Sequence, residues 1–166
     1  MPKLIKLSGH DLAWADDVFI DVADEDDIPE GPVILSMTRF QAEGDALISS
    51  NRPVGVRVLA GEAIEDLAYD LPRIAVVALV FPKFRDGRHY SSARLLRERF
   101  KYDGEIRALG DVLLEQARFM IRCGFDAFVP ADGSTPEAWA GAASRYRHVY
   151  QRATDDLVPA FEERRG

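Results

Sequence analysis

The sequence has very little cysteine: Cys123 is the only one among its 166 residues. An intramolecular disulfide is therefore excluded, and no CxxC or Cys/His cluster is present to bind zinc or an iron–sulfur cluster. Cys123 lies in the apolar context FMIRCGF, and free cysteine is among the most buried residue types. We expect a buried thiol rather than a redox-active one.

Long apolar runs are also absent. No run approaches the roughly 18 residues of a membrane-spanning helix. The N-terminal stretch MPKLIKLSGHDLAW lacks the apolar core and small-residue cleavage site of a signal peptide. We therefore expect a cytoplasmic protein with no membrane contact. Its length suits one domain that buries a core of its own.

The common catalytic and cofactor motifs are missing. We find no GxSxG, GxGxxG, Walker or HExxH pattern, so no catalytic residue and no cofactor is assigned. One carboxylate follows each of three expected strands, and together they could coordinate a metal ion: Glu62, Asp111 and Asp132. Because one carboxylate after each strand is also what helix capping produces, we favour capping and expect no metal site.

Positive charge is scarce, with a net charge of −7, and it is concentrated in one segment. Seven of the 21 Lys and Arg residues lie between Lys83 and Lys101, against two acids. An acidic protein of this kind does not suit general nucleic-acid binding. Residues 1–30 instead carry nine acids against two lysines, which we interpret as a solvated, weakly ordered segment or as a docking surface for a basic partner.

Short apolar runs rich in Val, Ile and Phe alternate with helical patterns from residue 32 onward. The run IAVVALVF is apolar throughout, as in a parallel-sheet strand buried on both faces. About five strand–helix units predict an α/β fold with mostly parallel strands. Two arrangements of this sheet are compatible with the pattern. One is an open three-layer sheet, which we favour, and the other is a partial β/α barrel whose uncovered side would need a partner. The expected strands are 32–37, 54–60, 74–81, 105–109 and 125–130.

Helices are expected between these strands. Gly61 precedes a helical pattern over 62–69, and Asp111 suits the cap of a helix over 112–122. The start signal Ser134-Thr135-Pro136-Glu137 predicts a helix from there to about residue 152. Residues 3–7 and 17–21 are expected to pair as a hairpin or to add an edge strand. We divide the chain into an acidic N-terminal segment (1–30), a single α/β domain (31–152) and a polar tail (153–166).

The loop after the third strand is the predicted site. Ligands of parallel α/β sheets gather at the carboxyl ends of the strands, and a loop from 82 to 90 is longer than most connections there. It offers basic side chains, an Asp-Gly turn and hydroxyls suited to capping a helix that runs to about residue 101. We predict an anion- or partner-binding site comprising Lys83, Arg85, Asp86, Gly87, Arg88, Ser91, Ser92 and Arg94.

Two neighbouring features are interpreted more plainly. Arg94, Arg97 and Lys101 recur at helical spacing, which is typical of a solvated helix face. His89 has an ordinary pKa near neutrality and lies close to Asp86, as an acid–base residue could. No nucleophile motif accompanies it, so a catalytic role is not assigned.

The segments FPKFRDGRHYSSARLLRERF and GEIRALGDVLLEQARFMIRCGFDAF resemble the signature of an uncharacterised bacterial family. Its genes typically lie beside those for assimilatory sulfite reductase and phosphoadenylylsulfate reductase. The resemblance covers about residues 30–130 and implies a role in assimilatory sulfate reduction. The family commonly has glycine where this chain has His89, which favours Asp86, Arg88 and Ser91 over His89 as shared functional residues.

Three functions follow as expectations. The first is an accessory or small-subunit protein that docks on sulfite reductase or on an acidic electron carrier such as ferredoxin. The second is an enzyme or module that binds sulfite, sulfate, phosphate or a nucleotide-linked sulfate. The third, a flavin-binding oxidoreductase, rests on analogy. A homodimer is a modest expectation.

Overall fold

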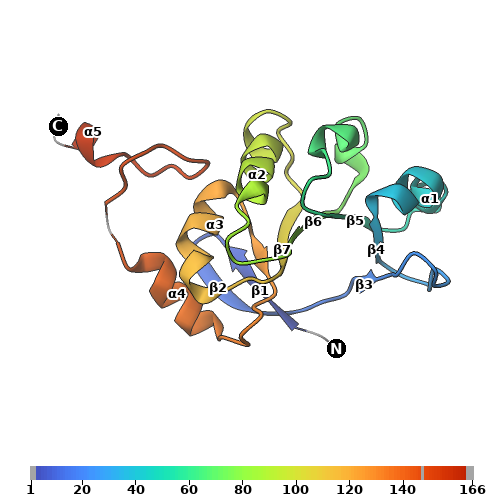
Figure 1. Ribbon diagram of the computed structural model, residues 1–166, viewed down its shortest axis with the longest axis horizontal. Coiled ribbons are helices and arrows are strands. Elements are labelled where there is room, and N and C mark those ends of the chain that lie inside the picture. The colour runs from blue at the N-terminus through green and yellow to red at the C-terminus, as the bar shows by residue number, and fades with distance from the viewer. Residues whose placement is uncertain (1–2, 147, 164–166) are drawn as a thin grey trace.

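The computed structural model describes residues 3–146 and 148–163 and shows a mixed α/β fold (Figure 1). Within these residues, eight strands form one sheet in the order β2-β1-β8-β7-β6-β5-β4-β3. The predicted α/β class is confirmed, although there are more strands than expected and only β3 to β8 run parallel. The strands are β1 (Lys3–Ser8), β2 (Asp11–Asp16), β3 (Ile20–Asp21), β4 (Val33–Ser36), β5 (Val54–Val58), β6 (Val76–Phe81), β7 (Glu105–Gly110) and β8 (Ala127–Phe128).

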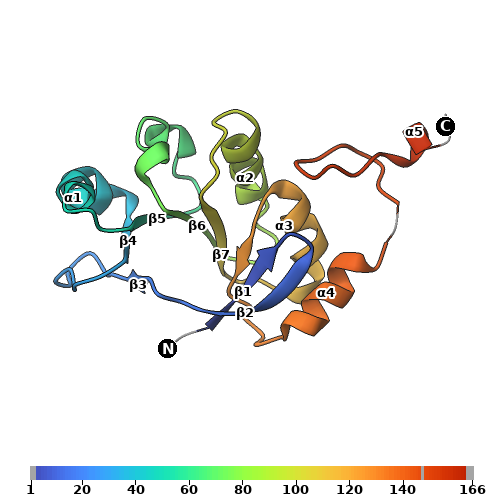
Figure 2. The ribbon, with the colours of Figure 1, turned by 180° about the vertical axis from the view of Figure 1, so that it is seen from behind.

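The helices α1, α2 and α3 lie on one side of the sheet in both ribbon views (Figures 1 and 2). The larger hydrophobic core is built from alternate residues of the central strands, such as Val77 and Leu79, and from the helices that cover them. The helical elements are α1 (Met37–Ser49), the 3₁₀ turns η1 (Ile64–Leu67), η2 (Leu71–Arg73) and η3 (Leu114–Gln116), α2 (Arg88–Glu98), α3 (Ala117–Cys123), α4 (Pro136–Ser144) and α5 (Ala160–Glu163).

The sheet curls into a half barrel, because its two edge strands are joined by a very short link. β2 and β3 lie at opposite edges, yet only residues 17–19 separate them in the chain. Eight flat strands would hold the edges about 34 Å apart, whereas this link reaches at most about 14 Å. The sheet must therefore curve until its edges approach. The favoured open three-layer sheet is thus corrected to the partial barrel.

Residues 17–21, which we call the strap, run from β2 to the opposite edge of the sheet, and Phe19 faces the concave side of this half barrel. Phe19 packs there on a small apolar cluster of Ile34, Val76 and Ala78. Beside it, Arg107 of β7 is buried and pairs with Asp17. The concave face is therefore filled by part of the acidic N-terminal segment.

The N-terminal hairpin extends the sheet beyond β8. β1 pairs with β2 over residues 11–16, and β1 also pairs antiparallel with β8. Residues 17–21 do not form the expected hairpin with residues 3–7. They supply the other expected arrangement, an edge strand, because Ile20 and Asp21 pair with β4 at the opposite edge of the sheet. The N-terminal segment thus forms three ordered strands. β1 is held by pairing with β8, and β3 is held by pairing with β4.

The helices are shorter than their sequence patterns indicate. The pattern over 62–69 forms only the turn η1, and the one over 112–122 is divided into η3 and α3. The start of α4 is confirmed, since Thr135 accepts a hydrogen bond from the Ala138 N–H and Pro136 is the first helical residue. This helix ends at Ser144, short of residue 152, and Arg147 in the expected helix lies outside the described residues. No helix in the described ranges is both long and apolar enough to cross a membrane.

Candidate functional site

The β6–α2 loop (residues 82–87) is held in place by polar side chains of the segment that follows β7. Asp111 accepts a hydrogen bond from the Phe84 N–H at 2.7 Å. The Gln116 amide donates to the Phe84 carbonyl at 3.3 Å and to the Tyr90 hydroxyl at 2.9 Å. The backbone of Phe84 is thereby fixed on both sides, while 43% of the residue is exposed. The loop therefore presents an aromatic side chain on a fixed backbone.

The positive charges of this loop are not equivalent. Arg88 forms a two-point ion pair with Asp86, with distances of 2.9 Å from Nε to Oδ1 and 2.5 Å from Nη2 to Oδ2. These hydrogen bonds lower the pKa of the Asp86 carboxyl to about 2. Lys83 and Arg85 are exposed and have no ion pair within residues 3–146 and 148–163. Two cations, rather than the expected three, are thus uncompensated.

The predicted hydroxyl cap of α2 is wrong. The helix begins at Arg88, with Gly87 as its N-cap. Asp86 accepts a hydrogen bond from the Arg88 N–H at 3.2 Å, and a carboxylate at this end also complements the helix dipole. Ser91 and Ser92 consequently lie inside the helix, away from its free N–H groups.

Arg94 is likewise separate from the loop. It lies on the exposed side of α2, and its guanidinium pairs with Glu98 one turn later at 3.0 Å. The structure therefore brings Lys83, Arg85, Asp86, Gly87 and Arg88 together in and beside the loop. Ser91, Ser92 and Arg94 lie further along the helix.

His89 lies at the base of the loop and is only 2% exposed. Its ring meets Phe81 edge-on, with the centroids 5.7 Å apart. Burial lowers the pKa of the imidazole, and the nearby Asp86 carboxylate acts against this shift. The Nε2 atom has no hydrogen-bond partner in the described part of the chain. His89 is therefore a neutral packing residue rather than an exposed acid–base group.

This burial predicts a pH dependence of stability. Because the pKa of His89 is lower in the folded protein, the unfolded chain binds more protons below its ordinary pKa of about 6.5. The free energy of unfolding should therefore rise as the pH increases from the lowered pKa of His89 in the folded protein to its ordinary pKa. It should fall again when the pH is lowered and the buried imidazole has to be protonated. The limiting slope is about 1.4 kcal/mol per pH unit. Urea unfolding of the wild type and of His89→Leu across about pH 5–7.5 tests this. The variant should show the flatter profile, and identical profiles would refute it.

Arg97 is not part of a solvated stripe, which corrects the sequence interpretation. Its guanidinium donates to the carbonyls of Gly124, Tyr102 and Gly104 at 3.0, 2.7 and 2.8 Å. It also pairs with Asp126 at 3.1 Å. Asp126 in turn accepts a hydrogen bond from the Ile106 N–H at 2.8 Å. Several positions that carry the family resemblance thus serve to join α2 to the strands β7 and β8.

Cys123 is buried, as expected. Burial raises the pKa of its thiol to about 11. Since only the thiolate is nucleophilic, the native thiol should react with a disulfide reagent at about pH 8 roughly a hundredfold more slowly than an ordinary thiol. Labelling with such a reagent with and without urea measures this difference, and equally fast labelling in both would refute the prediction.

The three carboxylates that follow strands all bind backbone N–H groups. Glu62 accepts from Leu59 at 2.6 Å, Asp111 from Phe84 and Asp132 from Ser134 at 3.0 Å. These contacts stabilise turns and loops. The three carboxylates do not cap the helices that follow them, whose N-caps are Ala63, Leu113 and Thr135, so the capping interpretation is wrong. Among the described residues, no group of three or more His, Cys, Asp or Glu side chains is arranged to hold a metal ion.

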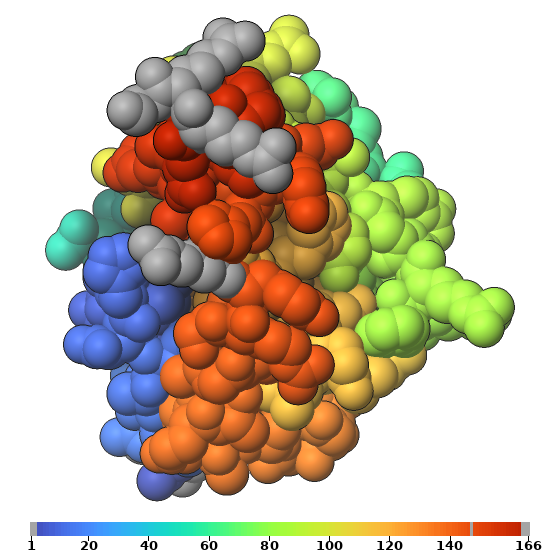
Figure 3. Space-filling view, turned by 90° about the vertical axis from the view of Figure 1, so that its left-hand side faces the viewer, coloured from blue at the N-terminus to red at the C-terminus, as the bar shows by residue number. Residues whose placement is uncertain are grey.

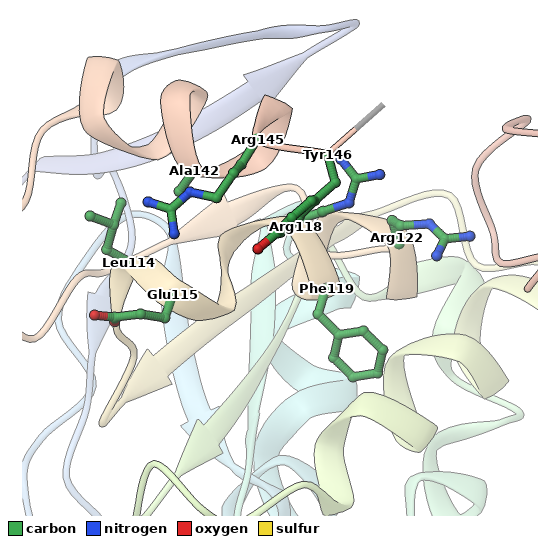
Figure 4. A pocket seen from close by; sticks show the side chains of 8 residues that line it. All are labelled: Leu114, Glu115, Arg118, Phe119, Arg122, Ala142, Arg145 and Tyr146. Carbon is green, nitrogen blue, oxygen red and sulfur yellow. The ribbon is translucent and has the colours of Figure 1, made fainter. Parts of the chain in front are cut away.

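Sequence reasoning missed a cavity of about 400 Å³ between α3 and α4 (Figure 4). A wider groove of about 860 Å³ shares Arg118, Arg122 and Tyr146 with it. The only signal in the sequence was a pair of arginines four residues apart, next to Phe119. Figure 3 shows the orange surface of α4 and, projecting beside it in light green, the segment that includes the β6–α2 loop. The cavity is lined by Leu114, Glu115, Arg118, Phe119, Arg122, Ala142, Arg145 and Tyr146.

Comparison with known proteins assigns a family without an activity. None of the curated proteins matches the chain. Residues 55–161 match the model of a family described as "Bacterial protein of unknown function (DUF934)". This range includes both motif segments, the β6–α2 loop and the cavity. The chain therefore belongs to the DUF934 family of bacterial proteins.

Proposed function

We propose that this protein is an accessory or small-subunit protein of assimilatory sulfate and sulfite reduction, and that its β6–α2 loop docks on sulfite reductase or its electron donor. The pathway is what the resemblance of the two motif segments implies. The docking role is supported by one observation. Phe84 is exposed on a backbone fixed by Asp111 and Gln116. It lies between Lys83 and Arg85, which form no ion pair with any residue that the structure describes.

Such an arrangement suits a protein interface. Aromatic and arginine side chains supply most of the binding energy in typical interfaces. A loop fixed before binding loses little conformational entropy on docking. The two exposed cations would steer an acidic partner, such as a ferredoxin-like electron carrier, toward Phe84. The partner surface is expected to be acidic with an apolar recess.

A small oxyanion is a weaker candidate for the same loop. Its site was expected to combine three basic side chains with the hydroxyls of Ser91 and Ser92. Arg88 is instead neutralised by Asp86, and the two serines lie within α2. Titration with sulfate, sulfite and phosphate distinguishes the two functions, since tight binding that Arg85→Ala abolishes would favour the oxyanion.

Gene deletion tests the pathway. The deletion strain should grow poorly on sulfate and on sulfite, and normally on sulfide or cysteine. The wild-type gene should restore growth, whereas Phe84→Ala combined with Arg85→Glu should not. Arg94→Ala is the matched control, because it removes an exposed cation of α2 outside the loop. Normal growth of the deletion strain on sulfate would contradict the pathway, and full restoration by the loop variant would contradict docking through the loop.

A further inference from the structure

We propose that the outer edge of β2 pairs with β2 of a second copy of this chain, so that two sheets join across a twofold axis. β2 is the last strand of the sheet, and β1 pairs with it on one side only. An unpaired edge strand is a template for another strand, and strand addition is a recurrent mode of protein recognition. β2 contains no residue of the β6–α2 loop, so the proposal is independent of the docking function.

The pairing of β1 determines which backbone groups of β2 point outward. The Leu7 N–H donates to the Asp126 carbonyl, on the β8 side of β1, at 2.9 Å. Since successive residues of a strand direct these groups to opposite sides, the next residue, Ser8, faces β2. Ser8 lies opposite Asp11, whose backbone groups therefore point toward β1. Every second residue from the next position onward directs its N–H and carbonyl away from the sheet: Leu12, Trp14 and Asp16.

This outer edge has no feature that blocks another strand. β2 pairs with β1 in unbroken register from Asp11 to Asp16, so it has no bulge, and it contains neither proline nor lysine. Within residues 3–146 and 148–163, no hydrogen bond from another element reaches the outward backbone groups. Trp14 is 43% exposed. Figure 3 shows the N-terminal hairpin (blue) at the surface beside α4 (orange).

Charge selects one register for two antiparallel copies of β2. With Ala13 on the twofold axis, Asp16 lies opposite His10 of the second copy, and no two acids are directly opposite. Moving the axis one residue onward would place Asp11 opposite Asp17 of the second copy, and like charges in such positions are destabilising. Moving it one residue toward the turn would shorten the overlap of the two strands. The register centred on Ala13 is therefore the one that a second copy fits.

The same register brings apolar side chains together. Leu12 lies opposite Trp14 of the second copy, and the twofold axis repeats this pair. Side chains of directly opposite residues are in contact, and burial of an aromatic side chain is strongly favourable. Leu12 packs on the main core and lines the groove of about 860 Å³, together with residues of α4. The indole of the second copy would therefore cover Leu12 beside this groove.

Disulfide trapping tests the register, because Cys123, the only native cysteine, is buried. In this register Ala13 lies opposite its own copy in a pair without hydrogen bonds, where the Cα atoms are about 4.5 Å apart. That distance suits a disulfide. Ala13→Cys should thus give a covalent dimer on mild oxidation, measured by non-reducing electrophoresis. Asp11→Cys and Ala15→Cys should each remain largely uncrosslinked, whereas a mixture of the two should cross-link, since these positions lie opposite each other.

The oligomeric state of the unmodified protein gives a second test. Sedimentation should show a dimer with a Kd of about 10 µM or below, and Trp14→Lys should weaken it by about tenfold or more. Trp14→Phe is the matched control and should retain the dimer. Phe84→Ala should retain it as well, so that failure of the docking proposal is distinguishable from failure of this one. Trp14 is exposed, so thermal unfolding should confirm that the variants fold.

Several results would overturn the proposal. One is a wild type that stays monomeric at about 100 µM, and another is a dimer that Trp14→Lys does not weaken. Equal cross-linking of the three single-cysteine variants would show that no defined register exists. A monomer that binds an extended basic peptide, and loses this binding in Trp14→Lys, would assign the edge to a different protein and exclude the second copy.

Discussion

Replacement of Arg107 by methionine is expected to lower the free energy of unfolding by about 3–5 kcal/mol. The side chain is 3% exposed, and it pairs with Asp17 and Glu105 at 2.7 Å each. Its guanidinium also lies over the Phe19 ring, 5.7 Å from the centroid. Methionine would fill the space but leave the Asp17 carboxylate without its cation in a poorly solvated position. The strap would then lose its main polar contact with the concave face.

Arg57→Met is the matched control for this effect. Arg57 projects from β5 on the same face and pairs with Asp21 of the strap, but that pair is more exposed. Its loss should cost about 1 kcal/mol or less, as is usual for exposed ion pairs. Chemical denaturation of both variants measures the difference. Equal and small costs would show that the strap does not depend on the buried ion pair.

Replacement of Arg97 by alanine is expected to cost about 2–4 kcal/mol. One guanidinium serves three backbone carbonyls and the Asp126 carboxylate, and the side chain is 19% exposed. Alanine would remove this donor from the three carbonyls and from Asp126 Oδ2 in a region that water reaches poorly, while Asp126 Oδ1 would keep its hydrogen bond from the Ile106 N–H. Burial already raises the pKa of Asp126, while Arg97 acts to lower it, so the variant should also favour the protonated carboxyl.

Arg94→Ala controls for the loss of a basic residue from the same helix. Its exposed pair with Glu98 should contribute less than about 0.5 kcal/mol. Thermal and urea unfolding of the two variants therefore compares a tertiary contact with a surface pair. Similar midpoints for Arg97→Ala and the wild type would contradict the structural role of Arg97.

The strands β4 to β8 were predictable from sequence, whereas β2 and the closure of the sheet were not. Runs such as 74–81 carry their own signal, since a strand covered on both faces is apolar at nearly every position. The curl depends on pairing between residues far apart in the chain, such as β1 with β8. The short link between the edge strands reveals the curl only once their order in the sheet is known.

The position of the β6–α2 loop was easier to predict from sequence than its contacts. The β6–α2 loop was indicated by its length and charge, both of which are local properties. Arg97 was misread because its partners Gly124 and Asp126 lie 27 and 29 residues further along the chain. The cap of α2 was misplaced because Asp86 binds the first N–H of the helix in place of a serine hydroxyl. The cavity escaped prediction because η3, α3 and the end of α4 form it only after folding.

The central claim is that the β6–α2 loop is a docking surface, and direct binding tests it most simply. Purified protein should be titrated against sulfite reductase and against its ferredoxin-type electron donor, at low and at high salt. We predict that one of them binds the wild type, more weakly at high salt, and that Phe84→Ala weakens this binding by about thirtyfold, as expected for an interface hot spot. Absence of binding to both proteins at low salt, or unchanged affinity in Phe84→Ala, would contradict the account.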